Sequence, residues 1–166
     1  VYRGMKYASY MVWPVRGQAN SRTIFPDASN PDRFTIHKDT VQDQATGLFW
    51  TRRAALTRKP VSWQSALDGI KGMNQQNAMG FSDWRLPHIR ELESLVDLNT
   101  HSPALPPGHS FEEVTDFYWS ATTSQYETRY AWALYLKDGA VGVGFKPNAE
   151  FFVWPVRGQM PGPADS

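Results

Sequence analysis

"GFSDWRLP", Gly80 to Pro87, separates two segments with helical periodicity and so sets the order of the predicted elements. Upstream, Ser62 is a good N-cap residue, and apolar residues then recur at the three-and-four spacing of one helix face as far as Met73. Downstream, Pro87 is typical of a helix start, and a second apolar stripe runs toward Asn99, formed by Ile89, Leu92, Leu95 and Val96. We therefore predict a helix on each side, the second with an exposed side that carries Arg90, Glu91, Glu93 and Asp97.

Strand patterns occur on both sides of these helices. In residues 32–53, apolar residues alternate with polar ones around a turn at 45–47, which predicts two short strands. Closer to the C-terminus, alternation predicts four further strands, "FYWSATT" (117–123), "RYAWALYL" (129–136), "AVGVGFK" (140–146) and "FFVWPVR" (151–157). Asp138-Gly139 is a strong hairpin signal between the second and third of them.

The same alternation predicts which side chains of the late strands face the core. In residues 129–136, Tyr135 lies on one face with two alanines, and the opposite, predicted core face carries Tyr130, Trp132, Leu134 and Leu136. Gly142 and Gly144 share one strand face, so we expect an aromatic ring, that of a Trp, to approach there. Pro155 has no N–H to donate, which places its strand at a sheet edge or at its own end.

Composition bounds the protein class. The 166 residues, 41% hydrophobic, suffice for one domain with extensions. A net charge of +1 gives no global field that would attract nucleic acid or a membrane surface. The absence of cysteine excludes disulfides, thiolate nucleophiles and cysteine metal sites. No run approaches the roughly 18 consecutive apolar residues that span a bilayer.

The chain contains one long internal identity, "VWPVRGQ", at residues 12–18 and again at 153–159. We expect residues 1–18 to be the terminal strand of a preceding repeat or a swapped edge strand, and 19–31 to be a linker. Residues 32–159 form the predicted domain, with a long proline-broken loop between its second helix and its late strands, and 160–166 form a disordered tail.

Six motifs in order resemble a known family: "TGLFW" (46–50), "SWQSAL" (62–67), "GFSDWRLP" (80–87), "EL" (91–92), "YWSAT" (118–122) and a closing "VR" (156–157). They resemble the Lcl C-terminal domain family, long described as a domain of unknown function and regarded as related to the C-type lectin-like fold. The resemblance implies an α+β, C-type lectin-like domain, with two helices packed on a twisted antiparallel sheet and a long irregular loop. Residues 1–18 would then be similar to the end of a preceding copy.

No catalytic constellation emerges from the sequence, and we expect no enzyme activity. The formylglycine-generating enzymes resemble this chain in an "RLP" segment, but they hold copper with cysteines, which are absent here. The four histidines match no zinc spacing, so we expect solvated side chains at His37, His88, His101 and His109. We interpret Arg85 and Glu91 as a buried structural pair that ties the "WRLP" turn to the second helix.

We expect no cofactor, although calcium is the natural alternative for a lectin-like fold, because loop oxygens can hold the ion and a sugar together. The available ligands are Asp97, Asn99, Glu112, Glu113 and Asp116. The sugar-binding lectins carry Glu-Pro-Asn or Gln-Pro-Asp with a later Trp-Asn-Asp, and the closest strings here are "KPNAE" and "YWSAT". A solvated acidic loop is therefore the favoured interpretation.

Two segments are candidates for ligand binding. "TRRAALTRKP" concentrates Arg52, Arg53, Arg58 and Lys59, and guanidinium groups match sulfate and carboxylate. The family's namesake is associated with sulfated glycosaminoglycans, which implies an anionic glycan; a charged loop without a ligand is the alternative. Near the ends of the late strands, the residue types of recognition surfaces gather, with site residues Tyr126, Arg129, Tyr130, Lys146 and Asn148, and Glu127 between them. The alternative is that the two tyrosines pack on the core.

These observations favour a non-catalytic module of a bacterial surface or adhesin-type protein, extracellular, on the cell surface or in the periplasm. Its partners would be a glycan or protein ligand and neighbouring copies of the same domain, without nucleic acid and without membrane insertion. One alternative is a structural spacer or self-association repeat, which the repeated "VWPVRGQ" favours. Another is a variable binding domain of the retroelement-diversified lectin-like type.

Overall fold

The computed structural model describes residues 30–160. The predictions for residues 1–18, for most of the 19–31 linker and for most of the 160–166 tail fall outside the described residues. The described elements are two helices, α1 (Trp63–Gln75) and α2 (Ile89–Ser94), a 3-10 helix η1 (Ala78–Gly80), and the strands β1 (Phe34–His37), β2 (Thr40–Asp43), β3 (Phe49–Thr51), β4 (Phe117–Thr123), β5 (Tyr130–Tyr135), β6 (Ala140–Phe145) and β7 (Val156–Arg157).

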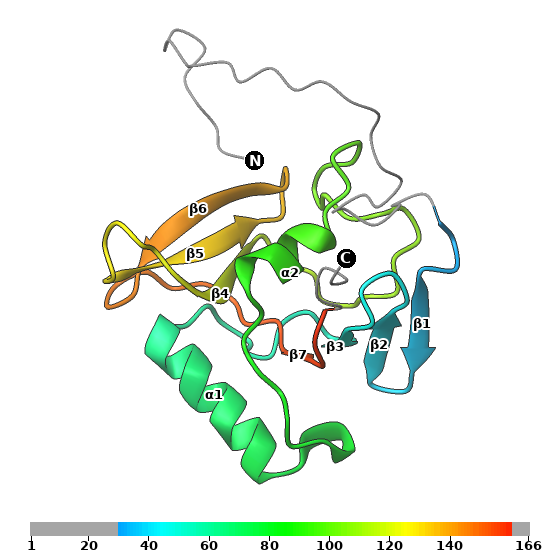
Figure 1. Ribbon diagram of the computed structural model, residues 1–166, viewed down its shortest axis with the longest axis horizontal. Coiled ribbons are helices and arrows are strands. Elements are labelled where there is room, and N and C mark those ends of the chain that lie inside the picture. Colours follow the sequence, from blue (N-terminus) through cyan, green and yellow to red (C-terminus); the bar gives the residue numbers. More distant parts are fainter. Residues whose placement is uncertain (1–29, 161–166) are drawn as a thin grey trace, which may run out of the picture.

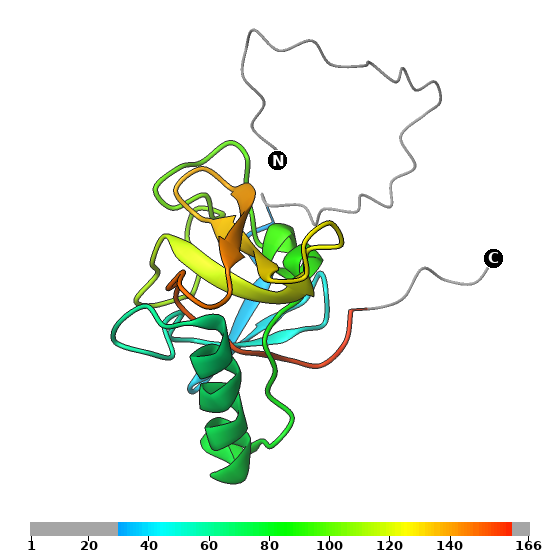
Figure 2. The ribbon, with the colours of Figure 1, turned by 90° about the vertical axis from the view of Figure 1, so that its left-hand side faces the viewer.

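The strands form two antiparallel sheets, ordered β1-β2-β3-β7 and β4-β5-β6 (Figure 1). The α+β class is confirmed, but the single sheet expected from the resemblance is wrong. Two short strands were expected before α1, and the structure has three, because a tight turn at Lys38 separates β1 from β2. In the second view α1 projects below the three-stranded sheet (Figure 2).

Residues 151–157 connect the two sheets, and we call them the closing strand. Phe151 exchanges two backbone hydrogen bonds with Val61, just before α1. The N–H of Phe152 donates to Phe117, and its carbonyl accepts from Trp119, both in β4. Val156 then pairs with β3 and exchanges two hydrogen bonds with Arg85. One extended segment therefore joins both sheets to the approaches of both helices.

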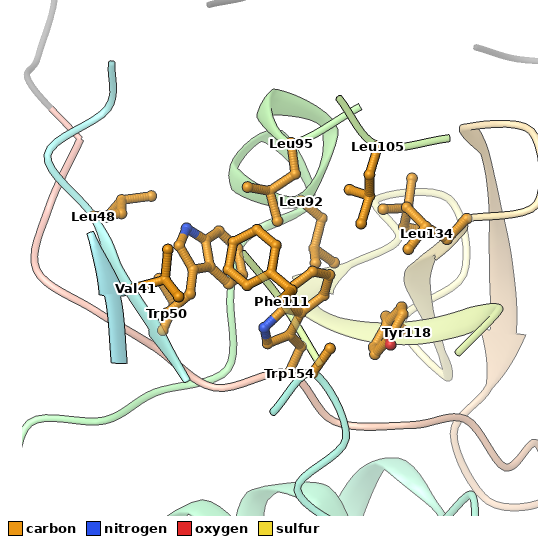
Figure 3. Packing of buried hydrophobic residues seen from close by; sticks show 13 residues of the cluster. Val41, Leu48, Trp50, Leu92, Leu95, Leu105, Phe111, Tyr118, Leu134 and Trp154 are labelled. Carbon is orange, nitrogen blue, oxygen red and sulfur yellow. The ribbon is translucent and has the colours of Figure 1, made fainter. Parts of the chain in front are cut away.

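Two apolar clusters meet at this strand. Trp154 belongs to the first, where its ring lies 5.4 Å from that of Trp50 and 4.7 Å from that of Phe111 (Figure 3). Val153 belongs to the second, together with the buried face of α1 and Trp84. The expectation for Pro155 is confirmed: β7 is the last strand of its sheet, and the Pro155 carbonyl accepts from Thr51.

The first helix agrees with its predicted signals, and the second is shorter than expected. Ser62 caps α1 by accepting a hydrogen bond from the N–H of Ser65. The second helix ends at Ser94 instead of near Asn99, because the N–H of Asp97 pairs with the Ala104 carbonyl and turns the chain into the long loop. The predicted exposed side is wrong for Glu91 and Asp97, which are only 4% and 7% exposed.

The predicted core face of the late strands is only half right. Leu134 and Leu136 are buried as expected, but Trp132 and Tyr130 are only half-buried. The opposite face, with Ala131 and its neighbours, is buried as well, because large rings lie over its small residues.

The glycines of β6 provide space for those rings. A Cβ added to Gly144 would overlap the rings of Trp119 and Phe151, so the expected approach of a Trp is confirmed there. At Gly142 the occupant is Tyr135 instead.

A Gly144→Ala variant should lower the free energy of unfolding by about 1–3 kcal/mol, because overpacking forces rings off their rotamers. Gly72→Ala is the matched control, since Gly72 lies inside α1 with nothing within 4 Å of its added Cβ. That substitution should stabilise by about 0.5–1 kcal/mol. Urea unfolding midpoints measure the stability of both variants. Equal shifts in the two would contradict the packing of the Trp119 and Phe151 rings against Gly144.

Candidate functional site

The end of the β5–β6 hairpin at Tyr130 and Phe145 carries an accessible aromatic surface, on the same strand face as the buried Leu134. Tyr130 lies opposite Phe145 in the register, with ring centroids 5.1 Å apart, and Trp132 lies opposite Val143. Val143 is 41% exposed, and the three rings are half-buried. Together with the loop residues Tyr126 and Arg129, we call these six residues the hairpin face.

Tyr126 is the most exposed large side chain of this surface, at 97%. It lies in the loop between β4 and β5, which Figure 1 shows at the far end of the sheet, above the start of α1. Backbone hydrogen bonds from Ser124 to the Tyr130 carbonyl and from Tyr130 to the Glu127 carbonyl close the loop. The phenol ring therefore projects into solvent from an ordered turn. The alternative that Tyr126 packs on the core is wrong.

Arg129 is the cation of the hairpin face, and it already has an anionic partner. Its guanidinium donates to both carboxylate oxygens of Glu127 at 3.1 Å and lies 5.7 Å from the Phe145 ring centre. The hydrogen bonds lower the pKa of Glu127 and raise that of Arg129. The pair is exposed and neutral in sum, so this surface offers planar and aromatic contact area without net charge.

Lys146 supports the loop from its other side. Its ammonium donates to the Thr123 hydroxyl at 2.8 Å and to the Thr128 carbonyl at 3.0 Å, and it lies 4.2 Å from the ring centre of Trp63. These contacts occupy the cation, so Lys146 positions the loop that carries Tyr126. Asn148 is exposed beyond the end of β6.

The predicted basic site lies against the acidic part of the long loop. Arg52 pairs with Glu112 at 2.6 Å, and Arg53 pairs with Glu113. Both arginines line a hollow of about 260 Å³, shared with Lys38, Asp39, Thr51, Met79 and Glu112. An anionic ligand would have to displace these carboxylates, which the local sequence, free of acidic residues, did not indicate.

The predicted pair of Arg85 and Glu91 is present, but only its Glu91 side chain is buried, and that of Arg85 is 31% exposed. Arg85 donates to both carboxylate oxygens of Glu91, at 2.7 and 2.6 Å, and also to the Gly158 carbonyl. Glu91 accepts in addition from the N–H of His88, at the start of α2. The pair therefore links the start of α2 to the backbone just after the closing strand.

The side chains considered for the calcium alternative do not converge. Asp97 accepts from Asn99, and Asp116 accepts from the N–H of Lys137, while Glu112 and Glu113 hold arginines. Within residues 30–160, no group of three or more His, Asp or Glu side chains is placed to hold a metal ion.

Sequence reasoning missed half of the hairpin face. Trp132 was assigned to the core, while Val143 and Phe145 were not considered, and neither was the support that Trp63 gives to Lys146. The Asp138-Gly139 turn signalled the hairpin but not its register: a two-residue turn there would pair Lys137 with Ala140, whereas the observed loop of residues 136–139 pairs Tyr135 with Ala140 and so Tyr130 with Phe145.

Comparison with known proteins identifies one family. The family model described as the Lcl C-terminal domain matches residues 39–157 of this chain. A search of curated proteins gave no match. Among the helices that the structure describes, none is long and apolar enough to cross a membrane.

His109 gives a pH prediction for the long loop. Its Nδ1 accepts a hydrogen bond from the N–H of Phe111, and burial lowers the pKa of the imidazole. The unfolded chain therefore takes up this proton at higher pH than the folded one. The contribution to stability is complete above about pH 6.5 and decreases as the pH falls toward the lower, folded pKa.

The matched variant is His109→Asn, whose amide oxygen can accept from Phe111 without titrating. Between about pH 7.5 and pH 5, wild type should lose more unfolding free energy than the variant. Chemical denaturation at both pH values measures the difference. The same loss in both proteins would show that His109 is solvated, as the sequence had suggested.

Proposed function

From the premise that this chain belongs to the Lcl C-terminal domain family, we propose that it is a non-catalytic recognition module of the C-type lectin-like class. The ligand is a glycan or a protein, and the contact surface is the hairpin face. The parent is a bacterial surface or adhesin-type protein, outside the cytoplasm.

One observation carries the proposal: the aromatic side chain of Tyr126 is 97% exposed in an ordered loop that leads into β5, the strand that carries the half-exposed rings of Tyr130 and Trp132. Exposed aromatic side chains lose little conformational entropy on binding and supply large contact areas. Because Tyr126 is 97% exposed, its whole ring area is available for contact with a ligand.

The charges around the face favour a ligand held by ring contact and hydrogen bonds over one held by its anionic groups. Arg129 is neutralised by Glu127, and Lys146 is engaged by the loop. In the basic segment, Arg52 and Arg53 are paired as well. Binding through the hairpin face should therefore depend little on ionic strength.

A second candidate function is a self-association repeat of a surface protein. The repeated "VWPVRGQ" favours it, because a copied segment indicates that more than one unit of this fold occurs together. A variable binding domain of the retroelement-diversified type would use the same hairpin face.

Tyr126→Ser tests the recognition function on a glycan and protein ligand array probed at two salt concentrations. Retention should fall about tenfold or more, as for an aromatic hot spot, and by the same factor at both salts. The unfolding midpoint should stay unchanged, since the side chain packs on nothing. Leu98→Ser is the matched control, because Leu98 is 68% exposed but lies outside the hairpin face.

Arg53→Gln separates the basic segment from the hairpin face in the same assay. We expect unchanged retention, because Arg53 is already held by Glu113. Retention that disappears with Arg53 and falls steeply with salt would place an anionic ligand on the basic segment. No retention by any ligand of the array would favour the self-association repeat.

A further inference from the structure

Each residue of the second "VWPVRGQ" copy up to its glycine has a defined contact. Val153, Trp154 and Val156 are fully buried, and the Trp154 indole N–H donates to the Thr51 carbonyl at 3.1 Å. The Val153 carbonyl accepts from Leu56 at 2.9 Å. These apolar positions are therefore specified by the site that receives them.

The polar end of the copy is specified as closely. Arg157 donates to Asp83 at 2.7 Å, and its guanidinium carbon lies 3.7 Å from the Phe81 ring centre. Gly158 has φ +88°, which disfavours any residue with a Cβ, and its carbonyl accepts from Arg85. We call the receiving site, formed by residues 49–56 and 81–85, the closing slot.

Residues 12–17 have the same letter at every one of these positions. Trp13 corresponds to Trp154, Arg16 to Arg157 and Gly17 to Gly158. The two preceding residues, Tyr10 and Met11, are large and apolar like Phe151 and Phe152. All the slot's contacts named above come from residues outside the closing strand, so a strand delivered by another chain can make them equally well.

We propose that residues 12–17 bind the closing slot of a second copy of this domain, which makes the chain a donor of its closing strand. The partner is a copy of this fold whose own residues 153–157 are displaced or missing. Strand exchange of this kind retains the contacts of residues 153–158, because the donated residues 12–17 are identical, so its equilibrium is set by tethering and concentration more than by new interactions.

The slot that the structure describes within residues 30–160 is already filled by residues 153–157, so it has no room for residues 12–17. A slot on a second copy is therefore the site that we assign to them. In the other copy, Val12, Trp13 and Val15 correspond to Val153, Trp154 and Val156, which are fully buried. Burying these side chains removes apolar surface from water, which is favourable wherever a slot is open.

Disulfide trapping tests the exchange, because the chain has no cysteine of its own. Phe49 lies opposite Arg157 in the β3–β7 register, so a seated donor strand brings Arg16 opposite Phe49. The donor chain carries Arg16→Cys. The acceptor chain carries Phe49→Cys with Trp154→Ala, which weakens its resident strand. Mixing the two full chains under mild oxidation should give an interchain link between positions 16 and 49, identified by peptide mapping.

Two controls decide the outcome. Adding Trp13→Ala to the donor should lower the yield about tenfold or more, since the donor strand loses the ring that corresponds to the buried Trp154. A single chain with Phe49→Cys and Arg157→Cys should form its internal disulfide, which verifies the geometry.

An acceptor that retains Trp154 is run in parallel, in case Trp154→Ala alone prevents folding. With donor in excess it should form the same link in smaller yield and with the same dependence on Trp13. The same yield of the interchain link with and without Trp13→Ala would overturn the proposal. So would a chain with Arg16→Cys and Phe49→Cys that forms its link only within itself.

Discussion

The burial of Trp154 between the two sheets is the interaction on which the rest of this fold depends. The sheets share no strand, and the closing strand that carries Trp154 hydrogen-bonds to β3 on one side and to β4 on the other. The ring contacts Trp50, Phe111 and Tyr118, which come from β3, the long loop and β4. Without this strand, each sheet would expose an apolar face, so the domain is complete only when the segment is in place.

The position of the hairpin face follows from that closure. Phe151 of the closing strand stacks on Phe117 and covers Gly144, which fixes the inner face of the β5–β6 hairpin. The side chains of the opposite face then point away from Phe151, and near the loop the structure leaves Tyr130 and Trp132 half-exposed. The recognition surface that we propose therefore depends on Phe151, whose ring packs against the strand face that carries Gly144.

Local sequence patterns predicted the helices and strands well. Contacts between residues far apart in sequence could not be predicted from them. The Ser62 cap, the Asp138-Gly139 turn and the β4 boundaries could be read from neighbouring residues alone. The partners of Arg52 and Arg53 could not, because Glu112 and Glu113 lie 60 residues away in sequence. The same reason explains the errors at Glu91 and Asp97, whose burial depends on Arg85 and on the long loop.

Recognition and strand exchange are physically compatible in this domain. Phe151 of the closing strand packs on the hairpin face that carries Gly144 and Tyr135, whereas Tyr130, Trp132, Val143 and Phe145 lie on the opposite face. In the donated copy, Tyr10 corresponds to Phe151, so an aromatic ring would still cover Gly144. A second copy closed by this donated strand would therefore present the same outer rings, and assembly of several units would multiply the recognition surface without altering it.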